Sequence, residues 1–349
     1  MELTTVWFSL VAVLFIGYFV LEGFDFGVGM LLPVLARDDT ERRVMINTIG
    51  PVWDGNEVWV LVAGGATFAA FPEWYATLFS GFYLPLLLIL LALIVRNLAI
   101  EYRSKRDGVG WKQRWDLMFI VGSFVPALLW GVAFANIVHG VPIDGDKEFT
   151  GTLLTLLNPY GLLGGLTTVL LFLTHGAIFV SLKTDGEIRH RARALAVRVG
   201  AGAAVVAVVF LVWTQLLTGN AGSAVLFVVA AAALVAALGA ALLGREGWAF
   251  TGTMLTIAAA VAGLFTALFP DVMPSSTRVA WSLTTSNASA TDYTLTVMTW
   301  VAVIFTPIVL VYESWSYWVF RRRISTHHIP GGPPPPGRAP AVATGPPPR

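Results

Sequence analysis

The chain has 349 residues, of which 56% are hydrophobic and only 12% are charged. Soluble globular domains carry about 25% charged residues, so this chain has too little polar surface to coat a soluble enzyme of its size. Its 22 Lys and Arg nearly balance its 21 Asp and Glu, which leaves no basic field for binding nucleic acid. The composition therefore predicts an all-α polytopic membrane protein.

Apolar runs of about 20 residues, the length that crosses a bilayer, predict roughly nine transmembrane helices, arranged as helical bundles. The first run starts too close to Met1-Glu2 to leave a basic signal region, so we expect no cleavable signal peptide. In chain order, the runs cover residues 5–34, 49–71, 75–95, 116–138, 160–182, 197–218, 222–244, 250–270 and 292–320.

The distribution of Lys and Arg predicts the orientation of these spans. With the N-terminus outside, 20 of the 22 basic residues fall in inner segments, and only Lys147 and Arg278 fall outside. We therefore predict an outer N-terminus and a cytoplasmic C-terminus. Residues 1–325 form the predicted transmembrane domain, and the Pro-rich residues 326–349 form a predicted disordered cytoplasmic tail.

Two of the predicted spans carry pairs of acidic residues. Glu22 and Asp25 lie in the first span, and Asp54 and Glu57 in the second, each pair at the i, i+3 spacing of one helix face. A rise of about 1.5 Å per residue places both pairs in the inner half of the membrane. Each acidic residue at the centre of a bilayer costs about 2.5–3.5 kcal/mol, so something must offset their presence.

Two interpretations of these acids remain open. In the first, the acids are structural: they are protonated or hydrogen-bonded to neighbouring amides and carbonyls. In the second, they form a proton conduit, since buried carboxylates exchange protons near neutral pH. We favour proton handling for Asp25 and Asp54, and both interpretations stand equally for Glu22 and Glu57.

Other residues in the spans have structural explanations. Glycines beside the first acidic pair predict close packing between helices. Arg96 is interpreted as an interfacial anchor at the end of the third span, and Glu313 as a side chain that reaches towards the basic cluster at Arg321. His175 is the one histidine inside a span, and we interpret it as a packing residue. A single haem with methionine as second ligand stays open.

No cysteine is present, and no phosphate-binding loop, nucleophile elbow or zinc motif is found. The absence of cysteine excludes disulfides, zinc–thiolate sites, iron–sulfur clusters and haem attached through Cys-x-x-Cys-His. Taken alone, the residues therefore indicate a proton-active membrane protein without a catalytic centre of its own.

Eight ordered segments closely resemble subunit II of the bd-type quinol oxidases. The most specific are Glu-Gly-Phe-Asp-Phe-Gly-Val-Gly-Met (22–30) and Pro-Val-Trp-Asp-Gly-Asn-Glu-Val-Trp (51–59). The others lie at 38–43, 79–83, 122–128, 158–163, 272–277 and 297–303, so the resemblance spans nearly the whole chain apart from the tail.

The resemblance implies a nine-helix subunit of a bacterial plasma-membrane complex, paired with a haem-bearing subunit I. In that family the complex oxidises quinol and reduces O₂ to water with cytoplasmic protons, as a terminal respiratory oxidase. It also implies that haem b and haem d lie in the partner and that this chain binds no cofactor directly. Small accessory subunits and a structural quinone in this chain stay open.

Some roles are implied residue by residue. Asp25 and Asp54 match acids of a proposed proton path at the subunit interface. Trp59 matches a tryptophan at the mouth of a proposed oxygen channel, although a packing role is equally compatible with it. Glu22 and Glu57 stand where relatives carry other acidic or amide residues, so the resemblance leaves their roles open.

Two rival hypotheses remain. One is a stand-alone proton-coupled transporter that uses the two acidic pairs. The other is a purely structural partner whose carboxylates stay protonated. We expect an enzyme subunit that supports subunit I and supplies protons, with oxygen access as a further role.

Overall fold

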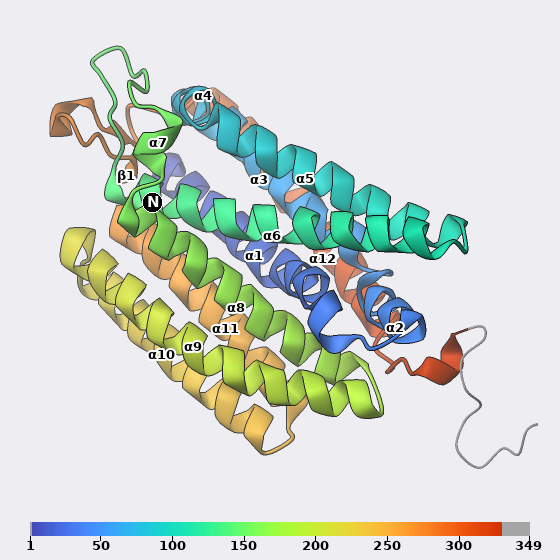
Figure 1. The fold of residues 1–349 in the computed structure, drawn as a ribbon. Helices are drawn as coiled ribbons and strands as arrows, with labels where there is room; N and C mark the ends of the chain where they lie inside the picture. Colours follow the sequence, from blue (N-terminus) through green and yellow to red (C-terminus); the bar gives the residue numbers. More distant parts are fainter. Residues whose placement is uncertain (1, 330–349) are drawn as a thin grey trace, which may run out of the picture.

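The computed structural model describes residues 2–329, which fold into a bundle of long α-helices with very little sheet (Figure 1). The helices are α1 (Leu3–Leu35), α2 (Asp39–Ile49), α3 (Trp53–Ala70), α4 (Pro72–Gly81), α5 (Tyr83–Tyr102), α6 (Val109–His139), α7 (Leu153–Leu156), α8 (Pro159–Lys183), α9 (Glu187–Thr218), α10 (Ala221–Leu242), α11 (Glu246–Leu268) and α12 (Asp292–Val319). The short elements are η1 (Arg103–Lys105), β1 (Asp271–Met273), η2 (Val279–Trp281), β2 (Leu283–Thr284) and η3 (Thr326–His328).

The all-α polytopic class is confirmed. Among the described residues, 8 helices are long and apolar enough to cross a membrane, and they correspond to eight of the nine predicted spans. The remaining predicted span, 49–71, contains the shorter helix α3, whose first turns are occupied by polar residues. The span predicted at 75–95 has the wrong bounds, because the chain breaks at Phe82 between α4 and α5.

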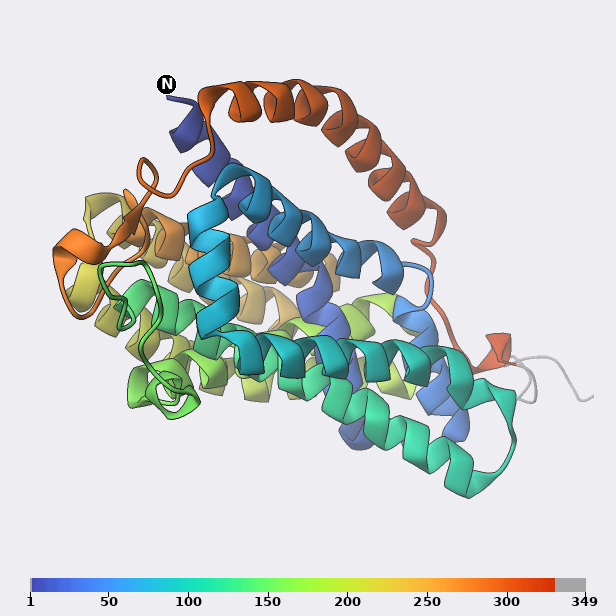
Figure 2. The ribbon, with the colours of Figure 1, turned by 90° about the horizontal axis from the view of Figure 1, so that it is seen from above.

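Helix α1 lies at the centre of the bundle and packs against α3, α6, α8 and α11 (Figures 1 and 2). Outside this core, α5 pairs with α6, α9 with α8, and α10 with α11. Helix α12 runs along the periphery, where only Leu295 of its residues is buried (Figure 2). The bundle therefore buries α1 thoroughly and leaves α12 open along most of its length.

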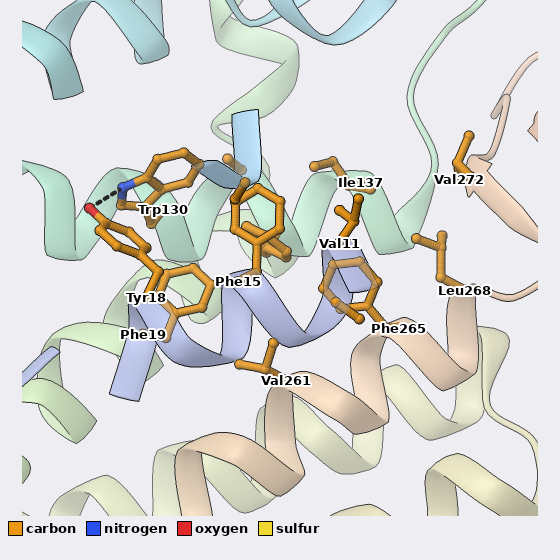
Figure 3. Close-up of a cluster of buried hydrophobic side chains, with 14 of the residues drawn as sticks. Val11, Phe15, Tyr18, Phe19, Trp130, Ile137, Val261, Phe265, Leu268 and Val272 are labelled. Atoms are coloured by element: carbon orange, nitrogen blue, oxygen red, sulfur yellow. Dashed lines mark hydrogen bonds between the residues drawn. The ribbon is translucent and has the colours of Figure 1, made fainter. Parts of the chain in front are cut away.

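Aromatic side chains of α1 fill the middle of the bundle (Figure 3). Phe15 packs edge-on against Trp130 of α6 and is stacked with Phe265 of α11. The Trp130 indole donates to the hydroxyl of Tyr18 at 3.1 Å, which satisfies both polar groups inside the core (Figure 3). Burial of these rings is the main force that holds α1, α6 and α11 together.

The predicted close packing at the glycines of α1 is confirmed. A Cβ built on Gly27 would lie 2.8 Å from the Cα of Gly176 on α8, closer than real Cβ atoms approach. A Cβ on Gly23 would lie 2.7 Å from the ring of Phe172. These contacts let α1 and α8 approach backbone to backbone.

Ion pairs gather at one end of the bundle. Asp116 of α6 pairs with Arg42 and Arg103, at 2.9 Å and 2.5 Å. Partial burial opposes ionisation of Asp39 of α2, but hydrogen bonds from Lys112 and Arg103 outweigh it and lower the pKa of Asp39. These ion pairs lie at the end of the helices that the sequence predicts to be cytoplasmic.

The C-terminal segment returns to this same end. Arg323 donates to the carbonyl of Thr184, and η3 follows at Thr326–His328. The rest of the predicted tail, residues 330–349, lies outside the described residues.

Candidate functional site

A group of buried polar side chains lies between α1, α3 and α5. We call it the polar cluster. It consists of Glu22, Asp25, Asn56, Glu57, Arg96 and Asn97. Three of the four acids expected from the sequence therefore come together, whereas Asp54, in the first turn of α3, is exposed.

Asp25 is fully buried and is held by an amide. Its Oδ2 accepts a hydrogen bond from Nδ2 of Asn56 at 2.7 Å. The Oδ1 of Asn56 in turn accepts from the hydroxyl of Tyr317 at 2.6 Å. This chain of contacts connects α1 with α3 and with the otherwise exposed α12.

Glu22 forms a buried ion pair with Arg96 of α5. Both side chains are 0% exposed, and Nη1 of Arg96 donates to Oε1 of Glu22. The guanidinium also lies 5.0 Å from the ring centroid of Phe26, in a cation–π arrangement. The interpretation of Arg96 as an interfacial anchor is wrong, because the buried carboxylate of Glu22 compensates its charge inside the bundle.

Glu57 completes the cluster from α3. Its Oε1 accepts from Nδ2 of Asn97 at 3.1 Å. The chain neighbour of Glu57, Asn56, bonds to Asp25 of α1. The cluster thus closes into a ring of three helices. Glu22 joins α1 to α5, Asn97 joins α5 to Glu57 on α3, and Asn56 joins α3 back to Asp25 on α1.

The i, i+3 pairs do not act as pairs of equivalent groups. Glu22 contacts α5 while Asp25, one turn farther, contacts α3. Asp54 stays at the exposed start of α3, while Glu57 is half-buried. Each pair therefore contains groups with different neighbours or different exposure.

Glu313 of α12 does not reach the basic cluster. A Cβ on Gly55 would lie 2.8 Å from Oε1 of Glu313, so this carboxylate lies against the first turns of α3. Arg321, the expected partner, instead donates to the carbonyl of Trp318. The prediction for Glu313 is wrong because α12 leaves its carboxylate on the α3 side of the bundle.

Trp59 of α3 is half-buried and covers Gly17 of α1. A Cβ on Gly17 would overlap the indole ring, so the absence of a side chain there makes room for the tryptophan. This contact supports a packing role for Trp59. Its oxygen-channel role stays a prediction.

His175 has both ring nitrogens engaged. Nδ1 lies 2.7 Å from the hydroxyl of Thr253, and Nε2 lies 3.0 Å from the carbonyl oxygen of Val20. The ring is also stacked on Phe250, with centroids 4.8 Å apart. As arranged, the side chain offers no free nitrogen to a haem iron, and among residues 2–329 no group of three or more His, Asp or Glu is arranged to hold a metal ion.

Sequence reasoning missed two members of the polar cluster, Arg96 as the partner of Glu22 and Asn97. It also missed Tyr317, which donates to Asn56 from outside the cluster. Arg96 directly follows an uninterrupted apolar run, and this position could have indicated that it lies inside the membrane span. Because the predicted span ended at residue 95, Arg96 fell just outside it, whereas α5 begins later and runs on to Tyr102.

The chain is similar to known proteins along most of its length. A family model described as "Cytochrome bd terminal oxidase subunit II" matches residues 3–320. "Cytochrome bd ubiquinol oxidase subunit 2" of Bacillus subtilis (strain 168) is 42% identical over 329 residues, covering 93% of this chain and 97% of the relative. "Cytochrome bd-I ubiquinol oxidase subunit 2" of Escherichia coli (strain K12) is 40% identical over 365 residues, covering 93% and 96%.

The fold is also found in a solved structure. A chain of the bd oxidase from Geobacillus thermodenitrificans superposes with a TM-score of 0.73 at 16% identity, over 91% of this chain and 97% of that chain. The match along 3–320 and the identity to full-length relatives together establish the family. The chain belongs to the cytochrome bd terminal oxidase subunit II family.

Proposed function

We propose that this chain supplies protons to the oxygen-reducing partner of a bd-type quinol oxidase, through Asp54 and the polar cluster. As a subunit II, the chain is part of an oxidoreductase complex of the bacterial plasma membrane and works with a partner subunit. In the proposal, quinol and O₂ are the substrates of that complex. Haem b and haem d lie in the partner, which agrees with the engaged nitrogens of His175.

The observation that carries the proposal is the burial of several ionisable side chains together in the polar cluster. Acidic side chains in a membrane interior are costly, and they mark ion and proton pathways more often than packing. Here Glu22 and Asp25 are 0% exposed, and Glu57 is joined to them through Arg96 and Asn97. Three acids from two helices, gathered in one buried cluster, are more than packing requires.

Asp54 serves as the entrance in this proposal. It is exposed in the first turn of α3, which follows α2 in the chain after a short connection. Within one turn of the same helix follow Asn56, which holds Asp25, and Glu57. An amide does not relay protons readily, so Asn56 is assigned an orienting role and the carboxyl groups carry the protons.

The test replaces each acid by its amide in the complete complex. Asp25→Asn and Asp54→Asn keep the shape of the side chain and remove the titrating proton. We expect O₂ consumption at saturating quinol to fall about tenfold or more, with normal assembly and haem content. Asp146→Asn, in the loop between α6 and α7, is exposed; it is the matched control and should be silent.

Three results separate the hypotheses. A loss of turnover in an intact complex supports proton delivery. Full turnover in both variants contradicts it and favours permanently protonated, structural carboxylates. A transporter predicts proton flux by this chain without its partner, which purified chain in proteoliposomes would show.

A second proposal assigns oxygen access to Trp59. Its neighbours on α3 face outward, with Val58, Leu61 and Val62 45%, 68% and 48% exposed, so this face meets lipid or the partner. O₂ is apolar and concentrates in the bilayer, which makes a membrane-facing entrance effective. Trp59→Phe should raise the KM for O₂ without changing kcat if the indole lines the path, and a silent variant would leave only the packing role.

A further inference from the structure

The polar cluster contains an unusual concentration of unpaired polar atoms. Six buried side-chain atoms in it have no hydrogen-bond partner among the described residues: Oε2 of Glu22, Oδ1 of Asp25, Oε2 of Glu57, Nε and Nη2 of Arg96, and Oδ1 of Asn97. Native proteins bury few such atoms, because each loses its bonds to water and gains none in return. Their gathering in one ring requires an explanation.

The ring is closed by contacts on every side. Glu22 bonds to Arg96, whose chain neighbour Asn97 bonds to Glu57. Asn56, next to Glu57 on α3, bonds to Asp25, one turn from Glu22 on α1. The unpaired atoms therefore belong to neighbouring residues on three helices.

The chemistry of the unpaired atoms selects the ligand. Four of them are acceptors, three on carboxyl groups and one on an amide, and the two nitrogens of Arg96 are donors. A cation would meet the guanidinium, and an anion would meet the carboxyl groups. An organic ligand has no access, since Glu22, Asp25 and Arg96 are 0% exposed. Water both donates and accepts, and a buried water typically makes about three hydrogen bonds.

We propose that this ring holds internal water, and that Arg96 is a positioning residue which orients both that water and Glu22. The hydration site stands on the unpaired atoms alone. Its role in proton transfer rests on the proposed function. Arg96 itself stays protonated, because a guanidinium does not release its proton in proteins.

The water supplies the connection that Asn97 cannot. One proton leaves the carboxylic acid of Glu57 for the water, and the water gives one of its protons to the carboxylate of Glu22. The water is regenerated, one proton has moved from α3 to α1, and one negative charge has moved from Glu22 to Glu57. Arg96 stays in place and keeps the water and its acceptor aligned during the step.

The first test is an experimental map of the whole complex, at a resolution that shows ordered water. We expect density about 2.7–3.2 Å from a nitrogen of Arg96 and from at least one carboxyl oxygen of the ring. A ring whose polar atoms bond directly to one another, or to the partner subunit, with no density between them, would overturn the hydration site.

The second test removes the lining without removing an acid. Asn97→Leu keeps a similar volume and deletes one donor and one acceptor. We expect turnover to fall about tenfold in the assembled complex, with a larger slowing in D₂O than the native complex shows. The control is Leu98→Ile, one residue farther along α5 and exposed. Native turnover and a native D₂O effect in Asn97→Leu would contradict the role.

Arg96 is tested with its partner, because Arg96→Gln alone leaves Glu22 unpaired and threatens assembly. The double variant Glu22→Gln/Arg96→Gln removes both charges together and retains two hydrogen-bonding amides. We expect it to assemble with normal haem content and to show slowed turnover with an enlarged D₂O effect. A double variant that turns over like the native complex would refute the positioning role.

The outcomes also separate this inference from the proposed function. If Asp25→Asn is slow while Asn97→Leu and the double variant are native, proton delivery stands and the water step is wrong. If water is seen but Asp25→Asn and Asp54→Asn are native, the hydration site stands and its role in proton transfer is wrong.

Discussion

The two sides of α1 bury different kinds of side chain. On the side of α3 and α5, the bundle buries Glu22, Asp25 and Arg96 at 0% exposure and leaves several of their atoms unpaired. On the side of α8 to α11, it buries small and apolar residues, and glycines allow close contact between the helices. Buried charges and unpaired polar atoms cost stability, so the polar side is where we place the chemistry.

The apolar side also contains a cavity. A cavity of about 110 Å³ lies between α1, α6, α8, α9, α10 and α11, and every residue that lines it is apolar or a threonine. Its lining includes Phe19, Phe172 and Leu234. An apolar cavity of this size stays dry. The apolar side thus leaves room between its side chains, whereas the polar side contains the buried hydrogen-bonding groups.

The largest expected effect comes from breaking the buried ion pair. Arg96→Gln leaves the carboxylate of Glu22 uncompensated, which costs about 3–5 kcal/mol. We expect poor assembly and a large fall in the melting temperature of the complex. Adding Glu22→Gln should recover most of this loss. If the single variant melts like the native complex, the pair is not what stabilises this side.

The next effect tests the close contact of α1 and α8. Gly27→Ala forces a Cβ against the backbone of Gly176, so we expect a loss of about 1–3 kcal/mol. Gly64→Ala is the matched control, because a Cβ there meets nothing within 4 Å. It should be neutral or slightly stabilising, since alanine favours helix. Equal melting temperatures for both variants would mean that close packing does not hold the apolar side.

Filling the cavity should act in the opposite direction. Ala260→Val adds two methyl groups to its lining, and we expect a gain of about 0.5–1 kcal/mol in thermal stability. Ala232→Val on the exposed face of α10 is the control and should give no gain. A loss of stability in Ala260→Val would contradict the expectation that this cavity has room for a larger side chain.

The smallest effect concerns the charged end of the bundle. The lowered pKa of Asp39 means that its pairing with Lys112 and Arg103 contributes stability above its unfolded pKa. That contribution is lost as the pH falls through the lower folded pKa. Because the Asp39 side chain is 44% exposed, it contributes only about 0.2–1 kcal/mol.

Asp39→Asn should therefore lower the melting temperature slightly at neutral pH. The difference from the native complex should shrink with added salt and vanish in acid. A difference that persists unchanged below the folded pKa would contradict this assignment.

The sequence predicted the class of fold and the acids of the site because both depend on local patterns. Apolar runs give helices, and Glu22, Asp25 and Glu57 stand out against them. The partners could not be predicted, because Glu22 and Arg96 are separated by 74 residues and meet only through packing. The break at Phe82 had a local signal in Gly81, which a simple hydropathy reading passes over.

One measurement tests the central claim, that the polar side of the bundle delivers protons to the partner. The complex is reconstituted in proteoliposomes, and the charge movement across the membrane is followed during a single reaction with O₂. For Asp25→Asn in a complex with normal haem content, we predict that the charge movement due to proton uptake slows about tenfold or more. Native kinetics of charge movement in that variant would contradict it.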